Sequence, residues 1–153
     1  MKAWVQRVRR GRVCVAEKVI GEIGLGYVVF LGVKQGDTQA EAKFLADKTA
    51  ALRIFPDAQG RMNRSIMEAG GSVLVISQFT LHADTRHGNR PSFTRAAAAE
   101  EAARLYEYYL DCLRSILGPQ RVACGQFQAM MVVEICNDGP VSIELRSRNE
   151  DSV

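Results

Sequence analysis

Short apolar segments separated by turn residues make up most of the chain. Eight of these segments have the length and the branched or aromatic side chains of β-strands. They are residues 3–8, 12–15, 19–23, 26–33, 72–81, 121–124, 131–136 and 141–145. The run GYVVFLGV at 26–33 is apolar without interruption, which predicts a central strand covered on both faces.

Two other segments carry helical signals. Thr38 and Glu41 have the spacing of a capping box and predict a helix to about Leu52. Its expected inward side chains are Phe44, Leu45 and Leu52. A second helix is predicted over 96–117, ending at Gly118, with one apolar stripe. That stripe consists of Leu105, Tyr109, Cys112, Leu113 and Ile116.

Many strands and two helices predict an α+β fold. No repeat or linker divides the 153 residues, so we expect one domain over 1–153. We expect a mostly antiparallel, barrel-like sheet with about two helices packed on it. The four cysteines are scattered, and neither a signal peptide nor an apolar run long enough to span a bilayer is present. These features predict a cytoplasmic protein without membrane contact.

Charge adds little by itself, because 20 basic and 17 acidic residues give a net charge of only +3. The arginines are nevertheless clustered, in segment 7–12 and again in segment 86–90. Either cluster can meet phosphates, although such clusters are more often solvated surface.

Most conventional catalytic motifs are missing. The chain has no Gly-x-Ser-x-Gly nucleophile motif and no phosphate-binding Gly-x-x-x-x-Gly-Lys-Ser/Thr loop. His82 and His87 stand in a polar loop and lack the spacing of metal ligands, so we expect no metal and no cofactor. We expect His82 to be solvated there.

Two short stretches carry chemistry of another kind. SQFTL, at 77–81, ends an apolar strand with hydroxyl and amide groups, which are costly to bury without partners. We therefore expect this strand end to face solvent or a ligand, where polar groups and backbone N–H groups can stabilise an oxyanion. NDGPVS, at 137–142, combines a hairpin signal with a proline that cannot donate to a sheet. Taken alone, it is most simply a stiffened turn between two strands.

Together, SQFTL, the following ADTRHGNRPSF and NDGPVS resemble the D-aminoacyl-tRNA deacylase family. The similarity extends from MKAWVQRV through LRIFPDAQGRMNRSI to VSIEL, nearly the whole chain. Family members have Asn-x-Gly-Pro-Val-Thr, whereas this chain has Ser142 in the last place, which keeps the hydroxyl.

The resemblance implies an enzyme that hydrolyses the ester between a D-amino acid, or glycine, and the terminal adenosine of tRNA. It implies a homodimer in which a cis peptide between Gly139 and Pro140 reaches into the partner's pocket, so that the active site lies at the interface. A proline peptide adopts the cis form for only about 0.5–1 kcal/mol, and such a stiff turn can hold two carbonyls toward the substrate ammonium. An L-side chain would then meet the turn, whereas a D-side chain would not.

The expected catalytic residues are Ser77, Gln78, Phe79 and Thr80, and the expected substrate-binding residues are Arg7, Met131, Gly139 and Pro140. The resemblance makes Arg7 a brace for the Gly-Pro turn. Thr80 has no neighbouring base in the sequence, so we expect it to position groups while the 2′-hydroxyl of the tRNA assists hydrolysis. Phe79 can stack on the terminal adenosine or serve as a core anchor.

Two alternatives come from other classes of protein. A non-catalytic RNA-binding module would use the two arginine clusters, although few aromatic residues lie near them. A cysteine-dependent hydrolase would use Cys124 or Cys14 with His82 as its base.

Overall fold

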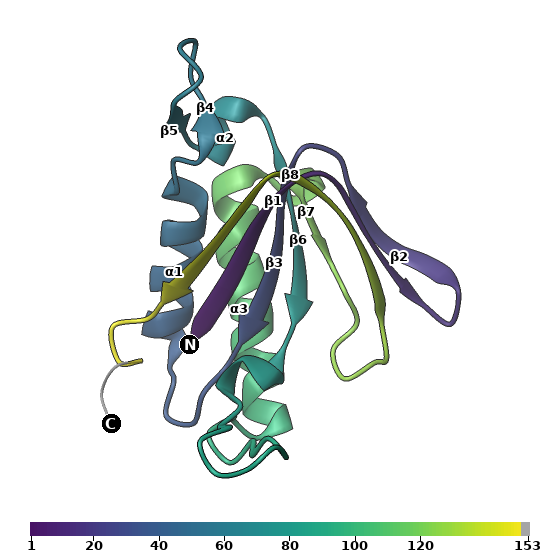
Figure 1. Cartoon of the computed structure of the whole chain (residues 1–153), viewed down its shortest axis with the longest axis vertical. Helices are drawn as coiled ribbons and strands as arrows, with labels where there is room; N and C mark the ends of the chain where they lie inside the picture. Colours follow the sequence, from purple (N-terminus) through teal and green to yellow (C-terminus); the bar gives the residue numbers. More distant parts are fainter. Residues whose placement is uncertain (151–153) are drawn as a thin grey trace.

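The computed structural model describes residues 1–150. Its strands form a six-stranded sheet and a separate two-stranded hairpin (Figure 1). The elements in chain order are β1 (Lys2–Val15), β2 (Lys18–Ile23), β3 (Gly26–Gly32), α1 (Gln39–Ala51), β4 (Phe55–Pro56), β5 (Met62–Arg64), α2 (Ile66–Ala69), β6 (Ser72–Ser77), the 3₁₀ turn η1 (Phe79–His82), α3 (Ala99–Leu117), the 3₁₀ turn η2 (Pro119–Arg121), β7 (Val122–Cys124) and β8 (Val132–Arg146).

The large sheet is antiparallel on one side and parallel on the other. β1 pairs antiparallel with β2, β3 and β8, whereas β3–β6 and β6–β7 are parallel pairs. Each parallel pair needs a crossover, which α1 with the β4–β5 hairpin provides in one case and α3 in the other. The predicted single domain of α+β class with a barrel-like sheet is therefore confirmed at the level of the fold, with a parallel half that the sequence pattern did not reveal.

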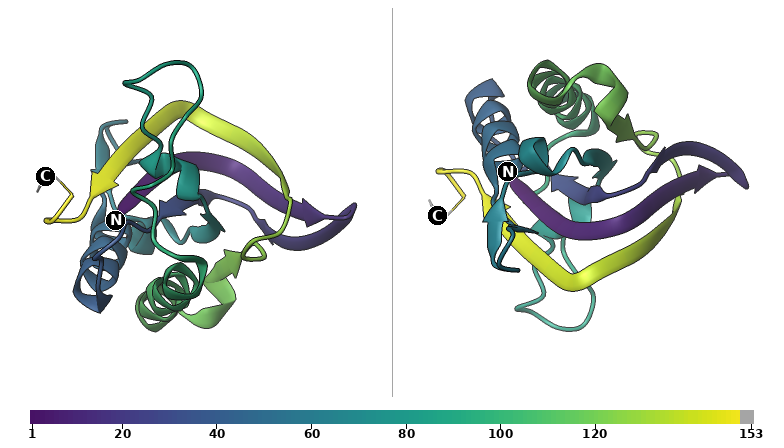
Figure 2. Two further views of the ribbon diagram at one scale, coloured as in Figure 1. Left: turned by 90° about the horizontal axis from the view of Figure 1, so that it is seen from below. Right: turned by 90° about the horizontal axis from the view of Figure 1, so that it is seen from above.

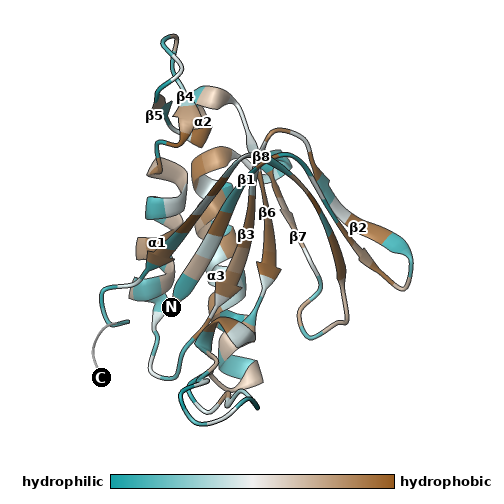
Figure 3. Cartoon of the chain, viewed as in Figure 1, coloured by the Kyte–Doolittle hydropathy of each residue, from teal (hydrophilic) through white to brown (hydrophobic). Residues whose placement is uncertain are grey.

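The sheet curls strongly, as Figure 2 shows, and it has a separate core on each face. α1 and α3 cover one face, where Val5, Val29, Leu45 and Leu110 are among the buried side chains. The inside of the curl holds a smaller cluster consisting of Val8, Val13, Ile23, Val28, Leu74 and Ile76. Figure 3 shows β3 and β6 as hydrophobic over most of their length, whereas β1 also carries hydrophilic stretches.

α1 begins with the predicted capping box. The Thr38 side chain accepts a hydrogen bond from the Ala40 N–H (3.2 Å), and Glu41 Oε2 accepts one from the Thr38 N–H (2.8 Å). α1 contacts α3 through a buried hydrogen bond of 2.8 Å between the hydroxyls of Thr49 and Tyr109. The capping box explains why the start of α1 was predictable from sequence alone.

α3 differs in detail from its prediction. It begins at Ala99 and not at residue 96, and Ile116 is 36% exposed, so its assignment to the inward stripe was wrong. A third helix, α2, was not expected. It is four residues long, and Ser65 caps it together with Glu68, the same capping-box spacing that marked α1. Within residues 1–150, no helix has both the length and the apolar character needed to cross a membrane.

Two pairs of predicted strands are single long strands. β1 joins the segments 3–8 and 12–15, and β8 joins 131–136 with 141–145. NDGPVS therefore does not form the simple hairpin turn that these six residues indicate when taken alone. Gln6 pairs with Ser142 and Val8 pairs with Asn137, so a single residue of β1 faces the four residues 138–141. The extra residues form a bulge in β8. Pro140 has no N–H to donate to β1, and β8 resumes its pairing with β1 after the bulge.

Candidate active site

The SQFTL segment turns away from the sheet directly after β6. Ser77 is the last strand residue, and residues 79–82 form η1, so the strand predicted over 72–81 was four residues too long. The Gln78 N–H still bonds to the Leu31 carbonyl of β3 (2.8 Å), while its own carbonyl accepts from the Leu81 N–H (3.3 Å). The first N–H groups of a helical turn have no acceptor within the turn, which leaves those of Phe79 and Thr80 available to a ligand.

Gly32, at the end of β3, lets this turn approach closely. A Cβ atom at Gly32 would lie 3.0 Å from the Gln78 carbonyl oxygen, 3.0 Å from Leu81 Cβ and 3.1 Å from His82 Cδ2. These separations are shorter than ordinary van der Waals contacts. The missing side chain therefore sets the position of η1 against the sheet.

A cavity of about 720 Å³ opens beside this turn, within the size range of small-molecule sites. β3, β6, the loop before α3, the first turn of α3 and the loop before β8 all contribute to it. The lining is apolar, apart from Ser77, two glutamines and Tyr106, and includes Phe79, Phe93, Phe127 and Met131. No charged side chain within residues 1–150 lines it.

Four of the predicted site residues line this cavity: Ser77, Gln78, Phe79 and Met131. Thr80, which was also predicted to belong to the site, does not line it. Thr80 borders a smaller adjoining hollow with Trp4 and Phe30. Phe79 is 57% exposed and contacts Phe93 edge to face, with ring centroids 5.0 Å apart. Phe79 is thus a surface aromatic at the cavity rim and not a core anchor.

The surroundings of Thr80 contain no base. Its Oγ1 accepts a hydrogen bond of 2.5 Å from Gln78 Nε2, the only side-chain bond of that hydroxyl within residues 1–150. His82 lies two residues after Thr80. We expected it to be solvated, but it is buried. Its Nδ1 lies 3.5 Å from Glu150 Oε1, and burial lowers its pKa. His82 therefore belongs to the packing beneath the turn.

The Gly139–Pro140 segment is exposed at the bulge of β8, and the peptide bond between the two residues is cis. Arg7 holds the residue before it: Nε donates to the Asp138 carbonyl (3.1 Å) and lies 3.3 Å from the Asp138 carboxylate. The Arg7 guanidinium also donates to the Ile54 carbonyl. Arg7 thereby ties the bulge to the β4 end of the molecule.

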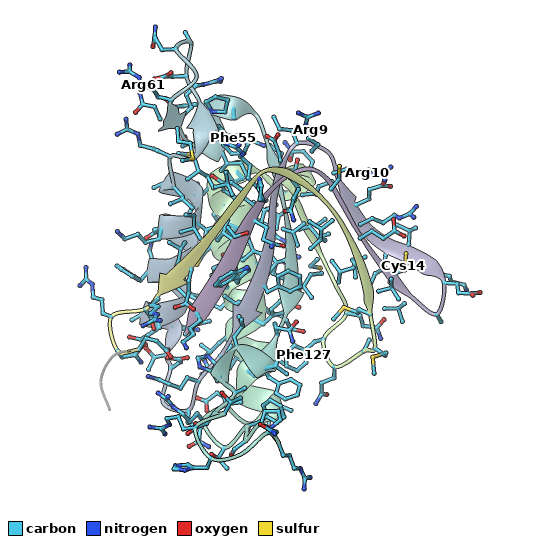
Figure 4. The ribbon with its side chains drawn as sticks, viewed as in Figure 1. Arg9, Arg10, Cys14, Phe55, Arg61 and Phe127 are labelled. Atoms are coloured by element: carbon cyan, nitrogen blue, oxygen red, sulfur yellow. The ribbon has the colours of Figure 1, made fainter. Side chains whose placement is uncertain are left out.

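Within one chain, the two halves of the predicted site lie at opposite ends of the sheet. Arg7 pairs with Tyr27 at the start of β3, whereas Leu31, which binds Gln78, lies at its end. Leu31 lies four residue steps after Tyr27 along β3, a distance of roughly 13 Å before side chains are counted. Figure 4 shows Arg9 and Arg10 near the bend of β8 and Phe127 towards the other end.

Several cavity residues escaped the sequence analysis. Phe93, Tyr106 and Phe127 supply ring surface, and alanines from segment 96–102 leave the space that larger side chains would fill. The run of four alanines at 96–99 was the available signal, because small side chains at the start of a helix leave room for a ligand.

The cysteine alternative gains no support. Burial raises the pKa of the Cys124 thiol, which disfavours the reactive thiolate, and no bond to His82 is present in the described chain. Cys14 pairs with Val19 and Val132 on another part of the sheet. Cys136, in β8, is exposed. Residues 1–150 contain no cluster of three side chains suited to a metal ion.

Comparison with known proteins gives a consistent result. The family model described as D-Tyr-tRNA(Tyr) deacylase matches residues 4–146. A D-aminoacyl-tRNA deacylase of Heliobacterium modesticaldum is 54% identical over 152 residues, covering 99% of this chain and all of that protein. The protein of the same name from Symbiobacterium thermophilum is 52% identical over 147 residues, 96% of each chain.

Solved structures agree on the fold. The protein titled c-Myc DNA Unwinding Element Binding Protein has a TM-score of 0.92 and 42% identity, covering 96% of this chain and 99% of its own. A probable eukaryotic D-amino acid tRNA deacylase has a TM-score of 0.78 at 16% identity, covering 94% and 98%, and shows the fold alone. The resemblance carried by SQFTL and NDGPVS is thus confirmed: the chain belongs to the D-Tyr-tRNA(Tyr) deacylase family.

Proposed function

We propose that this protein hydrolyses the ester bond of D-aminoacyl-tRNA in the cytoplasm and releases free tRNA and the D-amino acid. The observation that carries this proposal is the uncharged cavity bounded by Ser77, Gln78 and Phe79, in a chain that matches the deacylase family over residues 4–146. A nucleoside with an attached amino acid is of the size class that such a cavity accommodates. The exposed Phe79 ring at the rim is suited to stacking on the terminal adenine.

The working enzyme, in this proposal, is a homodimer with its active site at the interface. Arg7 and Gly139–Pro140 lie at one end of the sheet and the cavity at the other, so the two sets meet only between copies. β8 supports such an arrangement. Within residues 1–150 it pairs only with β1, and a long strand with an unpaired edge favours association.

Discrimination between D- and L-aminoacyl substrates follows from the position that the Gly139–Pro140 turn would take beside the bound amino acid. The carbonyls of Gly139 and Pro140 would accept hydrogen bonds from the substrate ammonium and fix the Cα of the amino acid. An L-side chain would then collide with main chain, which cannot move aside as a side chain can, whereas a D-side chain would point away. Glycine has no side chain to reject, so glycine attached to tRNA is a second substrate in this proposal.

Hydrolysis requires an oxyanion site and a nucleophile. The N–H groups of Phe79 and Thr80 at the start of η1 would bind the developing oxyanion. Water attacks the ester carbonyl, and the leaving ribose oxygen takes a proton as the bond breaks. The neighbouring 2′-hydroxyl of the terminal ribose would orient that water, because among residues 1–150 the Thr80 hydroxyl bonds only to the Gln78 side chain and has no base to activate it. Thr80 and Gln78 would then act as positioning residues.

The direct test measures release of labelled tyrosine from D-tyrosyl-tRNA and from L-tyrosyl-tRNA by the purified protein. The proposal requires rapid release of the D-form and slow release of the L-form. Equal rates would refute selection by the turn, and binding of tRNA without release would favour the RNA-binding alternative. Treatment with iodoacetamide serves as the control: activity that survives it excludes a cysteine nucleophile.

A further inference from the structure

The cavity has no charged lining residue among residues 1–150, whereas the 3′ end of a tRNA carries negatively charged phosphates. None of its lining residues within the described chain is basic. Every nucleotide that precedes the terminal adenosine carries a phosphate, and phosphates dominate the affinity of proteins for nucleic acids. Cations that bind this strand must therefore lie outside the cavity, along its rim.

The loop between η1 and α3 forms part of that rim. Asp84 and Ser92 pair across its base, with N–H to carbonyl distances of 2.8 and 2.9 Å, and this closes segment 84–92 into a compact loop. Phe93 follows at once, lines the cavity and packs against Phe79. Figure 3 shows hydrophilic residues in this region between β6 and α3.

The arginines of the loop differ in their partners. Arg86 is held within the loop, because its Nε donates to Asp84 Oδ1 (2.9 Å) and its Nη2 to Asp84 Oδ2 (2.5 Å). This bond to Arg86 keeps the pKa of Asp84 far below its usual range. Arg90 and Arg95 are exposed, and within residues 1–150 neither side chain makes a hydrogen bond or an ion pair. Arg95 directly precedes Ala96, which lines the cavity.

We infer that Arg90 and Arg95 bind phosphates of the single-stranded 3′ end of tRNA and lead its terminal adenosine into the cavity. The inference rests on the proposed function, and it assigns to this loop the recognition of the RNA backbone. Arginine is suited to the role, since its planar guanidinium can donate two hydrogen bonds to one phosphate. Arg86 is already paired with the Asp84 carboxylate, which neutralises its charge, so we assign it no phosphate contact.

The test compares two substrates, D-tyrosyl-tRNA and D-tyrosyl-adenosine, of which only the first has phosphates. For the double variant R90Q/R95Q we expect KM for D-tyrosyl-tRNA to rise roughly tenfold with kcat nearly unchanged, the size expected for lost charge-assisted bonds. Hydrolysis of D-tyrosyl-adenosine should stay at the wild-type rate. R86Q is the matched control within the same loop, and its KM should rise less than twofold.

Salt dependence gives a second readout. Each phosphate contact to a single strand contributes roughly 0.7 to the slope of log affinity against log salt concentration. For tRNA that carries no amino acid, the slope measured with R90Q/R95Q should therefore be smaller in magnitude than that of the wild type by about 1.4. Unchanged KM and slope in the double variant would overturn the inference. So would an equal loss on D-tyrosyl-adenosine, since it would mean that the loop shapes the cavity. If the wild type fails to hydrolyse either substrate, the proposed function fails, while the binding slopes still test the arginines.

Discussion

At the scale of single residues, the site is notable for main-chain groups. Thr80 bonds to Gln78, His82 is buried beneath the turn, and the groups that face the cavity are apolar or uncharged. An aminoacyl ester is a reactive bond, so positioned N–H groups and an ordered water are adequate for its hydrolysis. Replacing any one side chain of the site should therefore lower kcat only modestly.

Thr80 provides the clearest case. In T80V we expect kcat for D-tyrosyl-tRNA to fall less than about tenfold, whereas removal of a true nucleophile costs about 10⁶-fold. Thr80 is exposed, so this substitution leaves the fold intact. Single-turnover kinetics measure the effect, with T80S as the control. A loss in T80V beyond a thousandfold, restored in T80S, would make the hydroxyl the nucleophile.

Gly139 is the residue with the sharpest steric requirement in the turn. Its φ of +126° disfavours any L-residue, and an added Cβ would lie 2.9 Å from Val141 Cγ2 and 3.2 Å from Arg7 Nη2. We expect G139A to displace the turn and to raise L-tyrosyl-tRNA hydrolysis, relative to the D-form, by about tenfold, or ~1.4 kcal/mol of selectivity.

The ratio of kcat/KM for the D- and L-substrates measures this effect. G60A is the matched control, because Gly60 also has a positive φ (+77°) but no atom within 4 Å of an added Cβ, and it lies in the β4–β5 hairpin. An unchanged D/L ratio in G139A would remove the turn from chiral selection.

At the scale of elements, the site depends on how β3, β6 and η1 fit together. β3 and the start of α1 could be predicted from the sequence, because an apolar run and a capping box are local signals. The length of β8 was not, since a proline in a bulge and a proline in a hairpin turn look alike in sequence. The cavity was only half predicted: SQFTL marked one wall, whereas Phe93 and Phe127 reach it through tertiary contacts that no local pattern encodes.

Gly32 tests the fit between β3 and η1. In G32A the new methyl group would press on the Gln78 carbonyl and on Leu81, so we expect η1 to shift by tenths of an ångström. Misplaced groups of this kind lower kcat/KM by roughly 10–100-fold, while the free energy of unfolding falls by about 1–3 kcal/mol. Steady-state kinetics and urea unfolding measure the two effects.

G24A is the control for this substitution, because nothing lies within 4 Å of an added Cβ at Gly24. Full activity in G32A would show that the close approach of η1 to β3 has no part in catalysis.

At the scale of the whole molecule, the arrangement bears on two predictions: the pH dependence of stability and the proposed site between two copies. The first concerns His82, whose pKa is lowered by burial in the folded state, close to Glu150 and Lys2. The unfolded chain therefore binds a proton at a higher pH than the folded chain does. Stability from the neutral imidazole is complete above the unfolded value, about 6.5, and declines as the pH falls below it.

We accordingly expect the free energy of unfolding to decrease from pH 7.5 to pH 5.5 in the wild type, and to decrease less in H82L. H87Q is the control, because His87 is exposed, and its curve should follow the wild type. Urea titrations at several pH values provide the measurement. A wild-type curve that H82L reproduces would mean that other groups cause the pH dependence.

The proposed composite site between two copies is tested most directly with mixed dimers. M131R should block its own cavity, which Met131 lines, and G139A should hydrolyse L-tyrosyl-tRNA through a displaced turn. The two variants are co-expressed and isolated together through different C-terminal tags. If the turn acts across the interface, the open cavity of G139A would receive the intact turn of M131R.

The decisive quantity is the D/L ratio of kcat/KM of these mixed dimers. If the turn acts across the interface, the ratio returns to the wild-type value while D-tyrosyl-tRNA is still hydrolysed. A ratio that stays at the value of G139A alone would show that each chain uses its own turn, and would contradict the account.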